Sequence, residues 1–109
     1  MNWIKLETEE QISDIKNTDG YSLIFKHSTR CSISMMAKKR VEMDGDELPE
    51  DVQPYFLDLI AYRQLSALVA DVFQVHHESP QLLLIKNGEC VLDQSHGDIS
   101  ISEMVEVIQ

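Results

Sequence analysis

Short blocks of apolar residues, bounded by polar clusters, run through the chain, and their spacing predicts several strands. Residues 21–27, YSLIFKH, follow a polar turn and are rich in branched and aromatic side chains, which is typical of a strand. Residues 55–62, YFLDLIAY, are apolar on both faces but for one aspartate, as in a strand covered from both sides. QLLLIK and ECVLD flank the dipeptide Asn87-Gly88, a strong hairpin signal. Residues 3–6 predict a short first strand.

Helical spacing fills the gaps between these strands. Capping-box patterns begin at Thr8 and at Ser100, and each precedes an apolar helix face. The clearest stripe comprises Leu65, Leu68, Val69, Val72 and Phe73. A weaker stripe after the second strand comprises Ile33, Met36, Ala37 and Val41. This second stripe predicts a buried helix face, with Met35 and Met36 packed in the core or at its edge.

The resulting order of elements is β-α-β-α-β-α-β-β-α. Strands that alternate with helices pair in parallel through right-handed crossovers, and the closing hairpin adds antiparallel strands. We therefore predict an α/β fold of three layers, α/β/α, with a mixed sheet and a closing β-hairpin. This is the element order of the thioredoxin fold. A chain of 109 residues builds one core, so residues 1–109 are expected to form a single thioredoxin-like domain.

Charge and cysteine usage narrow the range of partners. Nine basic against nineteen acidic residues give a net charge of −10, which argues against nucleic acid and anionic membranes. The first residues lack the pattern of a secretory signal, and no apolar run approaches the ~20 residues that cross a bilayer. We expect a cytoplasmic protein in which both cysteines, Cys31 and Cys90, are free thiols.

Cys31 is the candidate reactive residue. It follows the strand 21–27 at the start of the next helix, and ligands of such sheets gather beyond the carboxyl ends of the parallel strands. A thiolate there faces unpaired backbone N–H groups and the positive end of the helix dipole. Arg30 and Lys26 are nearby cations that favour the anion further. The alternative is a buried structural cysteine at a helix start.

Ser34 stands three residues after Cys31, where a dithiol enzyme carries a second cysteine. With a serine there, the mixed disulfide between Cys31 and its substrate is not resolved by a second cysteine of the same motif. Its hydroxyl is able to bond the thiolate, although an ordinary serine on the helix surface is the alternative.

Further polar residues are expected at the same edge of the sheet. If residues 81–86 run antiparallel to residues 21–27, Ser79 and Pro80 face the thiol. Arg63 begins the helix after the third parallel strand and lies on that edge too. It is a candidate for binding a negatively charged group, and a solvated surface charge is the alternative.

The four histidines and Cys90 give weaker indications of function than Cys31. Neither the four histidines nor the two cysteines match closed zinc spacings, so no metal site is expected. His27 and His77 are instead candidates to stabilise the thiolate, with an ordinary loop histidine as the alternative. Cys90 lies past the hairpin turn, well over ~15 Å along the strand from Pro80. A disulfide needs Cα atoms within about 7 Å, so Cys90 is expected to be a packed strand residue.

Four separated segments, KHSTRCSIS, RQLSALVA, VHHESPQ and NGE with the later SH and IS, together resemble the YtxJ family of monothiol bacilliredoxins. These are thioredoxin-like proteins of low-GC Gram-positive bacteria, which use bacillithiol in place of glutathione. The resemblance covers nearly the whole chain in order. It implies a thiol–disulfide oxidoreductase that removes bacillithiol from oxidised cytosolic proteins through a mixed disulfide on Cys31.

On this resemblance Pro80 is a cis-proline, bacillithiol is a co-substrate, bacillithiolated proteins are the partners, and no bound cofactor is needed. The residues expected to bind substrate are Thr29, Arg30, Ser34, Arg63, His77, Ser79 and Pro80. The chain departs from the family motif Thr-Cys-Pro-Ile-Ser, since Arg30 precedes the thiol and Ser32 replaces the proline. These departures are expected to affect thiolate stability and the rigidity of the loop.

Two functions of other classes remain open at this stage. A glutaredoxin-like carrier would hold an iron–sulfur cluster between Cys31 and an external thiol. The Gly-Phe pair that follows the cysteine in such carriers is replaced here by Ser32-Ile33, which counts against this function. A non-catalytic thioredoxin-like binding module would leave the thiol incidental.

Overall fold

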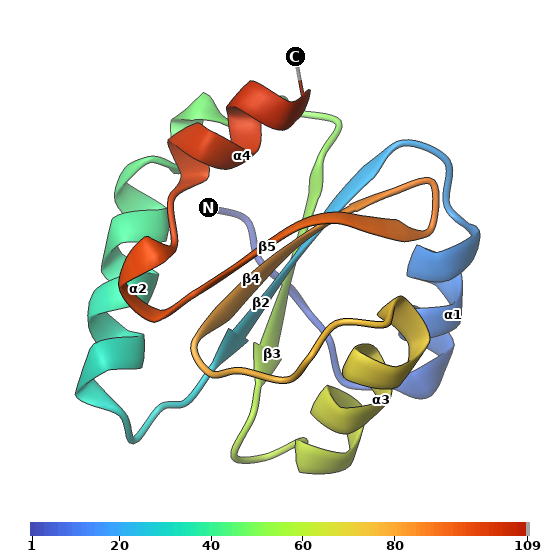
Figure 1. Cartoon of the computed structure of the whole chain (residues 1–109), viewed down its shortest axis with the longest axis horizontal. Helices are drawn as coiled ribbons and strands as arrows, with labels where there is room; N and C mark the ends of the chain where they lie inside the picture. The colour runs from blue at the N-terminus through green and yellow to red at the C-terminus, as the bar shows by residue number, and fades with distance from the viewer. Residues whose placement is uncertain (109) are drawn as a thin grey trace.

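The computed structural model describes residues 1–108 and confirms the predicted α/β architecture (Figure 1). Within these residues, five strands form one mixed sheet in the order β1-β3-β2-β4-β5. β1 (Ile4–Lys5), β3 (Gln53–Asp58) and β2 (Tyr21–His27) are parallel to one another. β4 (Gln81–Lys86) runs antiparallel to β2, as predicted, and forms the closing hairpin with β5 (Glu89–Ser95).

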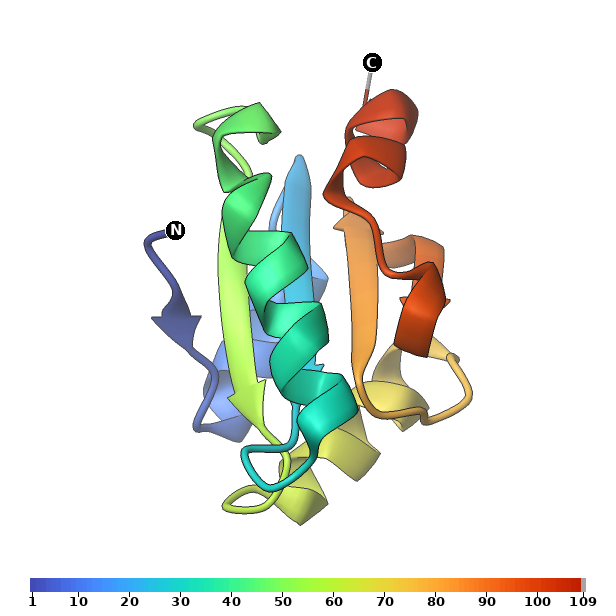
Figure 2. The ribbon, with the colours of Figure 1, turned by 90° about the vertical axis from the view of Figure 1, so that its left-hand side faces the viewer.

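Helices cover both faces of this sheet (Figures 1 and 2). One face carries α1 (Glu9–Asn17) and α3 (Arg63–Phe73), and the other carries α2 (Ser32–Met43) and α4 (Ile101–Ile108). Short 3-10 turns, η1 (Gly45–Glu47) and η2 (His96–Asp98), lead into β3 and α4. Within residues 1–108, none of the helices has the length and apolar character that crossing a bilayer requires.

Alternating side chains of β2 divide the interior into two cores. Ile24 belongs to the core under α1 and α3, whereas Leu23 and Phe25 belong to the core under α2 and α4. Successive residues of a strand point to opposite faces, so both faces of the central strand must be apolar. The carboxyl ends of β2 and β3 meet at one edge of the sheet, at the lower side of Figure 1.

Local sequence signals fix the ends of several elements. Thr8 accepts the N–H of Gln11 at 3.2 Å, and the Gln11 side chain returns to the Thr8 N–H at 3.1 Å, so the predicted capping box is confirmed. Asn87 and Gly88 both have positive φ, 50° and 82°, as a two-residue hairpin turn requires.

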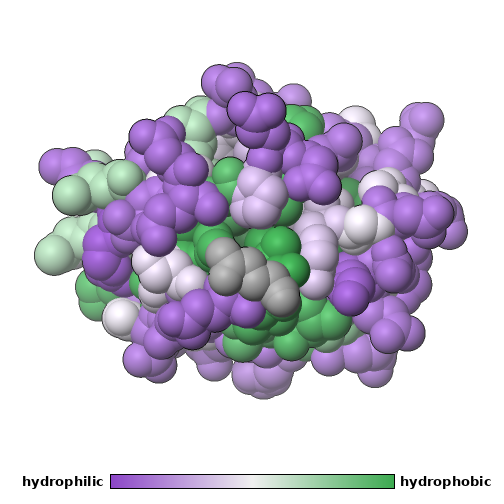
Figure 3. Space-filling model, turned by 90° about the horizontal axis from the view of Figure 1, so that it is seen from above, coloured by the Kyte–Doolittle hydropathy of each residue, from purple (hydrophilic) through white to green (hydrophobic). Residues whose placement is uncertain are grey.

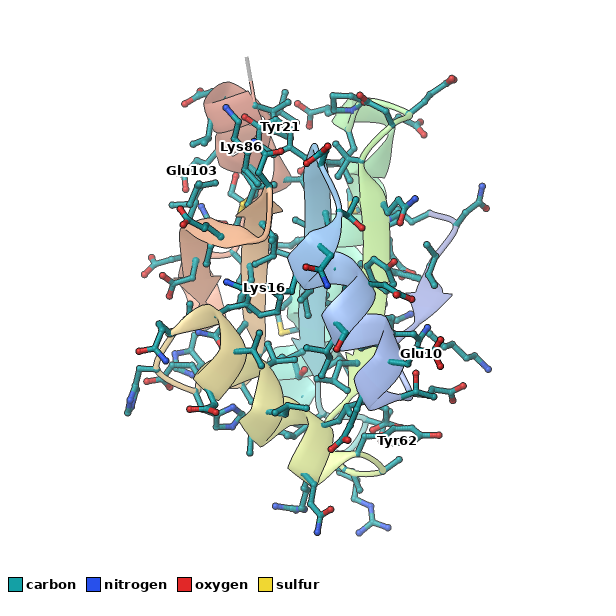
Figure 4. All side chains as sticks on the ribbon, turned by 90° about the vertical axis from the view of Figure 1, so that its right-hand side faces the viewer. Glu10, Lys16, Tyr21, Tyr62, Lys86 and Glu103 are labelled. Atoms are coloured by element: carbon teal, nitrogen blue, oxygen red, sulfur yellow. The ribbon has the colours of Figure 1, made fainter. Side chains whose placement is uncertain are left out.

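The hairpin turn is also packed closely against α1. A Cβ on Gly88 would collide with the Lys16 carbonyl, so this glycine permits the approach. Lys16 reaches across from α1 and donates to the Gly88 carbonyl at 2.9 Å (Figure 4).

The structure corrects the predicted buried face of α2. Ile33 and Met36 are 56% and 64% exposed, and Met35 is 53% exposed, so none of them packs in the core. The buried face consists of Ser34, Ala37 and Val41. These residues are also three and four positions apart. Ala37 and Val41 are buried as predicted, and the small polar side chain of Ser34 is buried in place of Ile33 and Met36.

The boundaries of β3 also differ from the prediction. The strand begins at Gln53 and ends at Asp58, whereas the apolar run continues to Tyr62. The Asp58 carboxylate accepts the N–H of Ile60 at 3.1 Å, which starts a turn in place of further strand. The four apolar residues after Asp58 therefore connect β3 to α3.

Candidate functional site

The turn between β2 and α2 brings Cys31 to the carboxyl edge of the parallel strands. β2 ends at His27, and Cys31 is the N-cap residue of α2. Its N–H donates to the Ser28 carbonyl at 3.2 Å, and its carbonyl accepts the N–H of Met35 at 3.0 Å. The residue therefore closes the turn and opens the helix, at the position that the sequence predicts.

The surroundings of the Cys31 side chain leave its sulfur available for chemistry. The residue is half-buried, is a free thiol, and makes no side-chain cap to the helix within residues 1–108. The first N–H groups of a helix have no partner inside the helix, and they favour an anion at this place. The first turn of α2 contains no acidic residue. Thr29 and Arg30 precede the thiol in the same turn, and both are exposed.

Ser34 is fully buried, so it is not the ordinary serine on the helix surface that was the alternative, and its contact with a substrate stays a prediction. Its side chain is 0% exposed, with Oγ 2.7 Å from His27 Nδ1 and accepting the Ser28 N–H at 3.0 Å. Burial, followed by the Lys38 ammonium, lowers the pKa of His27, which favours a neutral imidazole in this contact. Ser34 thus ties the end of β2 to the thiol turn, and His27 is part of the same buried contact.

Ser79 and Pro80 lie beside the thiol turn, as predicted. Lys26 pairs with Gln81 across β2 and β4, so Pro80 stands opposite His27. The Ser79–Pro80 peptide bond is cis, as expected. Ser79 Oγ is shielded from solvent and has no hydrogen-bond partner among residues 1–108. Buried hydroxyls are nearly always bonded, so an unpartnered one at this place is unusual.

Lys26 does not lie beside the sulfur as a free cation, contrary to the sequence-based expectation. Its side chain is 0% exposed and points to the α1 and α3 face of the sheet, opposite α2. The ammonium donates to the Ser66 carbonyl at 3.1 Å and lies 3.1 Å from His77 Nδ1. A lysine within the otherwise apolar run of β2 was the available signal, since a charge in a central strand must find partners.

Arg63 lies in a different setting from the thiol turn. It is exposed at the first residue of α3 and lines a hollow with Glu9, the first residue of α1, and with Glu7 just before that helix. Tyr62, labelled at the lower end of Figure 4, donates its hydroxyl to Glu7 at 2.9 Å in this region. The surroundings of Arg63 are therefore partly acidic. Its contact with a substrate stays a prediction.

Cys90 lies in the hairpin, away from the thiol turn. It pairs with Ile85, five residues along β4 from Pro80, which is roughly 16 Å at the usual rise of a strand. Burial, with Asp93 as the second cause, raises the pKa of the Cys90 thiol to about 11. It packs against the core under α1 and α3. A direct disulfide with Cys31 is incompatible with this separation.

The fold and the thiol turn define the class of the protein, a thiol oxidoreductase of the thioredoxin fold. A solved structure described as an oxidoreductase with a thioredoxin fold is 33% identical, with a TM-score of 0.84, over 97% of this chain and 93% of that chain. Thioredoxin from Trypanosoma brucei brucei superposes with a TM-score of 0.73 at 12% identity, over 96% of this chain and 86% of its own. A mutant thioredoxin from Halobacterium salinarum gives a TM-score of 0.68 at 17% identity, over 96% and 86% of the two chains.

The family model of the monothiol bacilliredoxin BrxC matches residues 4–104. Since this match spans all the strands and the thiol turn, the chain belongs to the monothiol bacilliredoxin family. The family confirms the resemblance seen in the sequence, and it gives the protein a role in thiol redox chemistry.

Proposed function

We propose that the protein removes bacillithiol from mixed disulfides on oxidised client proteins of the cytoplasm, with Cys31 as the attacking thiol. One observation carries the proposal. An accessible cysteine occupies the N-cap of α2, and a fully buried serine occupies the position of a second thiol. The family assignment supports bacillithiol as the small thiol.

The reaction follows from this arrangement. The Cys31 thiolate attacks the bacillithiol sulfur of the mixed disulfide, and the bond between the two sulfurs of the substrate breaks. The client cysteine leaves as a thiolate, and bacillithiol stays on Cys31. A second bacillithiol thiolate, or the thiolate of another redoxin, then attacks this adduct and regenerates the Cys31 thiolate. Each step exchanges one disulfide for another, so no bound cofactor takes part.

The groups around the thiol suit an anionic small thiol. Bacillithiol carries carboxylates on its malate end, and Arg30 is the exposed cation next to Cys31. The Ser79 hydroxyl has a free hydrogen-bonding capacity at the same edge. We assign Arg30 and Ser79 to substrate binding and retain Arg63 as a second cation to be tested.

The client protein is proposed to rest on the outer face of α2, defined by Ile33, Met35, Met36, Lys39, Arg40 and Met43. All six side chains are exposed, and no acidic residue occurs between Gly20 and Val41 although the chain carries a net charge of −10. Figure 3 shows mildly hydrophobic side chains projecting at the left margin, the side on which α2 runs in Figure 1. Flexible methionines with nearby basic groups suit varied client surfaces that are acidic and partly apolar.

The proposal is tested by following the release of bacillithiol from a bacillithiolated protein. We expect Cys31→Ser to abolish the release and Cys90→Ala to leave its rate within about twofold of wild type. Both variants should keep the fold, which circular dichroism checks. Release by Cys31→Ser at the wild-type rate would falsify the proposal.

A further inference from the structure

The loop from Val75 to Ser79, which leads into Pro80, is fastened by two buried polar side chains. The Gln81 amide donates to the His76 carbonyl at 3.0 Å and accepts the Glu78 N–H at 3.3 Å. Lys26 pairs with Gln81 across β2 and β4 and reaches His77 in the same loop. Both side chains are 0% exposed. The placement of Ser79 beside the thiol turn therefore depends on polar contacts made from two neighbouring strands.

Lys26 is the unusual member of this pair, because its charge has no carboxylate partner within residues 1–108. Its Nζ lies 3.1 Å from both the Ser66 carbonyl oxygen and His77 Nδ1, and Ser66 Oγ lies 3.4 Å from the same Nδ1. Buried charges are normally paired, since taking a lone charge out of water is costly. The ammonium is stabilised here only by dipolar groups, and His77 is the one of them that titrates.

The protonation states of the two groups are coupled through this contact. Burial lowers the pKa of Lys26 to about 8. Burial, followed by the Lys26 ammonium, lowers the pKa of His77. At neutral pH the lysine is therefore charged and donates to an unprotonated Nδ1. Glu78 and His76 are the other charged or titratable groups that act on His77, and they have opposite effects.

In acid, the favourable contact between Lys26 and His77 becomes a repulsive one. When His77 takes up a proton at Nδ1, the acceptor is lost and two cations stand 3.1 Å apart. Since the pKa of His77 is lowered, this change is expected below the usual histidine range of about 6.5. Above about 8 the lysine loses its charge, but the neutral amine still donates to Nδ1 and to Ser66.

We propose that Lys26 is a positioning residue that holds the loop 75–79 through His77, and that protonation of His77 releases this hold and weakens the capture of a disulfide by Cys31. The inference rests on the proposed function in so far as Cys31 attacks a disulfide that lies against Ser79. It implies that the rate of disulfide capture falls in acid for a reason other than protonation of the Cys31 thiolate.

The test compares two reactions of the same thiol. The first is with a peptide that carries a bacillithiol mixed disulfide, and the second is with iodoacetamide. Both need the Cys31 thiolate, so its ionisation cancels in the ratio of the two rate constants, whereas only the disulfide contacts the loop. In the wild-type protein we expect this ratio to fall from its value at about pH 7.5 once the pH is low enough to protonate His77, by about tenfold in all, as for the loss of one hydrogen bond.

Three variants locate the cause of the fall. His77→Asn places an amide oxygen near the position of Nδ1, so it keeps the acceptor but does not titrate. The ratio of the two rate constants in this variant should change by less than about twofold over the same pH range. His76→Asn is the matched control, since His76 is exposed like His77 but its ring makes no hydrogen bond to Lys26, and it should retain the wild-type fall. Lys26→Met should lower the ratio at neutral pH and remove its pH dependence. Titration of the substrate is common to all variants.

The outcomes separate this inference from the function on which it rests. Failure of Cys31 to react with the disulfide at any pH overturns both. A reaction whose ratio is independent of pH in the wild-type protein, or falls equally in His77→Asn, overturns only the role of Lys26 and His77. If Lys26→Met does not fold, the comparison of His77→Asn with His76→Asn still decides.

Discussion

The two cysteines lie in environments that differ in how far they stabilise a thiolate. The Cys31 side chain is half-buried at the N-cap of α2, where backbone N–H groups favour an anion. Burial raises the pKa of the Cys90 thiol to about 11. We expect iodoacetamide at neutral pH to alkylate Cys31 at least tenfold faster than Cys90, as measured by mass spectrometry of tryptic peptides. Equal labelling of the two thiols in the folded protein would contradict the assignment.

Ser34 and Ser32 offer a matched pair of serines on α2. Ser34→Ala leaves the Ser28 N–H and His27 Nδ1 without their partner, and unpartnered buried groups cost about 1–3 kcal/mol. We expect urea denaturation to show a loss of this size in the free energy of unfolding. Ser32→Ala, at an exposed position, should change it by less than about 0.5 kcal/mol. If the two variants are equally stable, the buried contact of Ser34 does not support the turn.

Arg30 and Arg63 are the two candidate cations for the carboxylates of bacillithiol. Arg30 adjoins the thiol, whereas Arg63 shares its hollow with Glu7 and Glu9. We expect Arg30→Ala to weaken the capture of bacillithiol by ~1–3 kcal/mol, and Arg63→Ala to have a smaller effect. The measurement is the rate with bacillithiol disulfide relative to that with a neutral disulfide. A larger loss in Arg63→Ala would reverse this ranking, and equal slowing of both substrates would remove the arginines from carboxylate binding.

At the scale of elements, α2 shows where sequence patterns stop being decisive. The spacing of Ile33, Met36, Ala37 and Val41 predicts one buried face, but Ser34, Ala37 and Val41 share a nearly identical spacing. The choice between them depends on contacts from β2, because His27 and the Ser28 N–H bury the Ser34 hydroxyl. Tertiary partners of this kind are not visible in the periodicity of one helix. The hairpin and the capping box at Thr8 were predicted correctly, since their signals are local.

The proposed docking of client proteins on the outer face of α2 leads to a testable prediction. Met36→Glu introduces a negative charge into an exposed apolar and basic surface near the thiol. We expect it to slow the reaction with a bacillithiolated protein of acidic surface several-fold, and to leave the reaction with bacillithiol disulfide nearly unchanged. Val91→Glu, at a 45% exposed position on β5, is the control and should affect neither. Equal effects of the two substitutions would remove α2 as the client surface.

At the scale of the whole molecule, the buried charge of Lys26 makes stability depend on pH. Burial lowers the pKa of Lys26 to about 8 in the folded protein, while the unfolded value is about 10.4. Between these values the unfolded state binds more protons, so stability rises with pH, and the cost of the charge is complete only below about 8.

We therefore expect wild type to gain roughly 3 kcal/mol relative to Lys26→Met between about pH 7 and about pH 10.5. Chemical denaturation of both proteins across this range gives the difference, in which titrations common to both cancel. A constant difference would mean that folding does not lower the pKa of Lys26, because the folded and unfolded states would then bind the same number of protons throughout this range.

The order of elements, the antiparallel run of β4 beside β2 and the cis bond at Pro80 were all predicted from the sequence, since they follow from local patterns and family motifs. The site was predicted less completely. Lys26 was expected beside the thiol. Because side chains alternate between the two faces of β2, it lies on the opposite face, where its ammonium contacts Ser66 and His77. Such a partner set depends on which helix covers each face of the sheet.

The central claim is that a single thiol carries the reaction and keeps the small thiol. The most direct measurement is the intact mass of the protein after mixing with a slight deficit of bacillithiolated substrate, without added reductant. We predict one bacillithiol adduct on Cys31 of each reacted molecule, with an equal loss of bacillithiol from the substrate. An internal disulfide with Cys90 and free bacillithiol in solution would contradict the account, because a second thiol of the chain would then have resolved the intermediate.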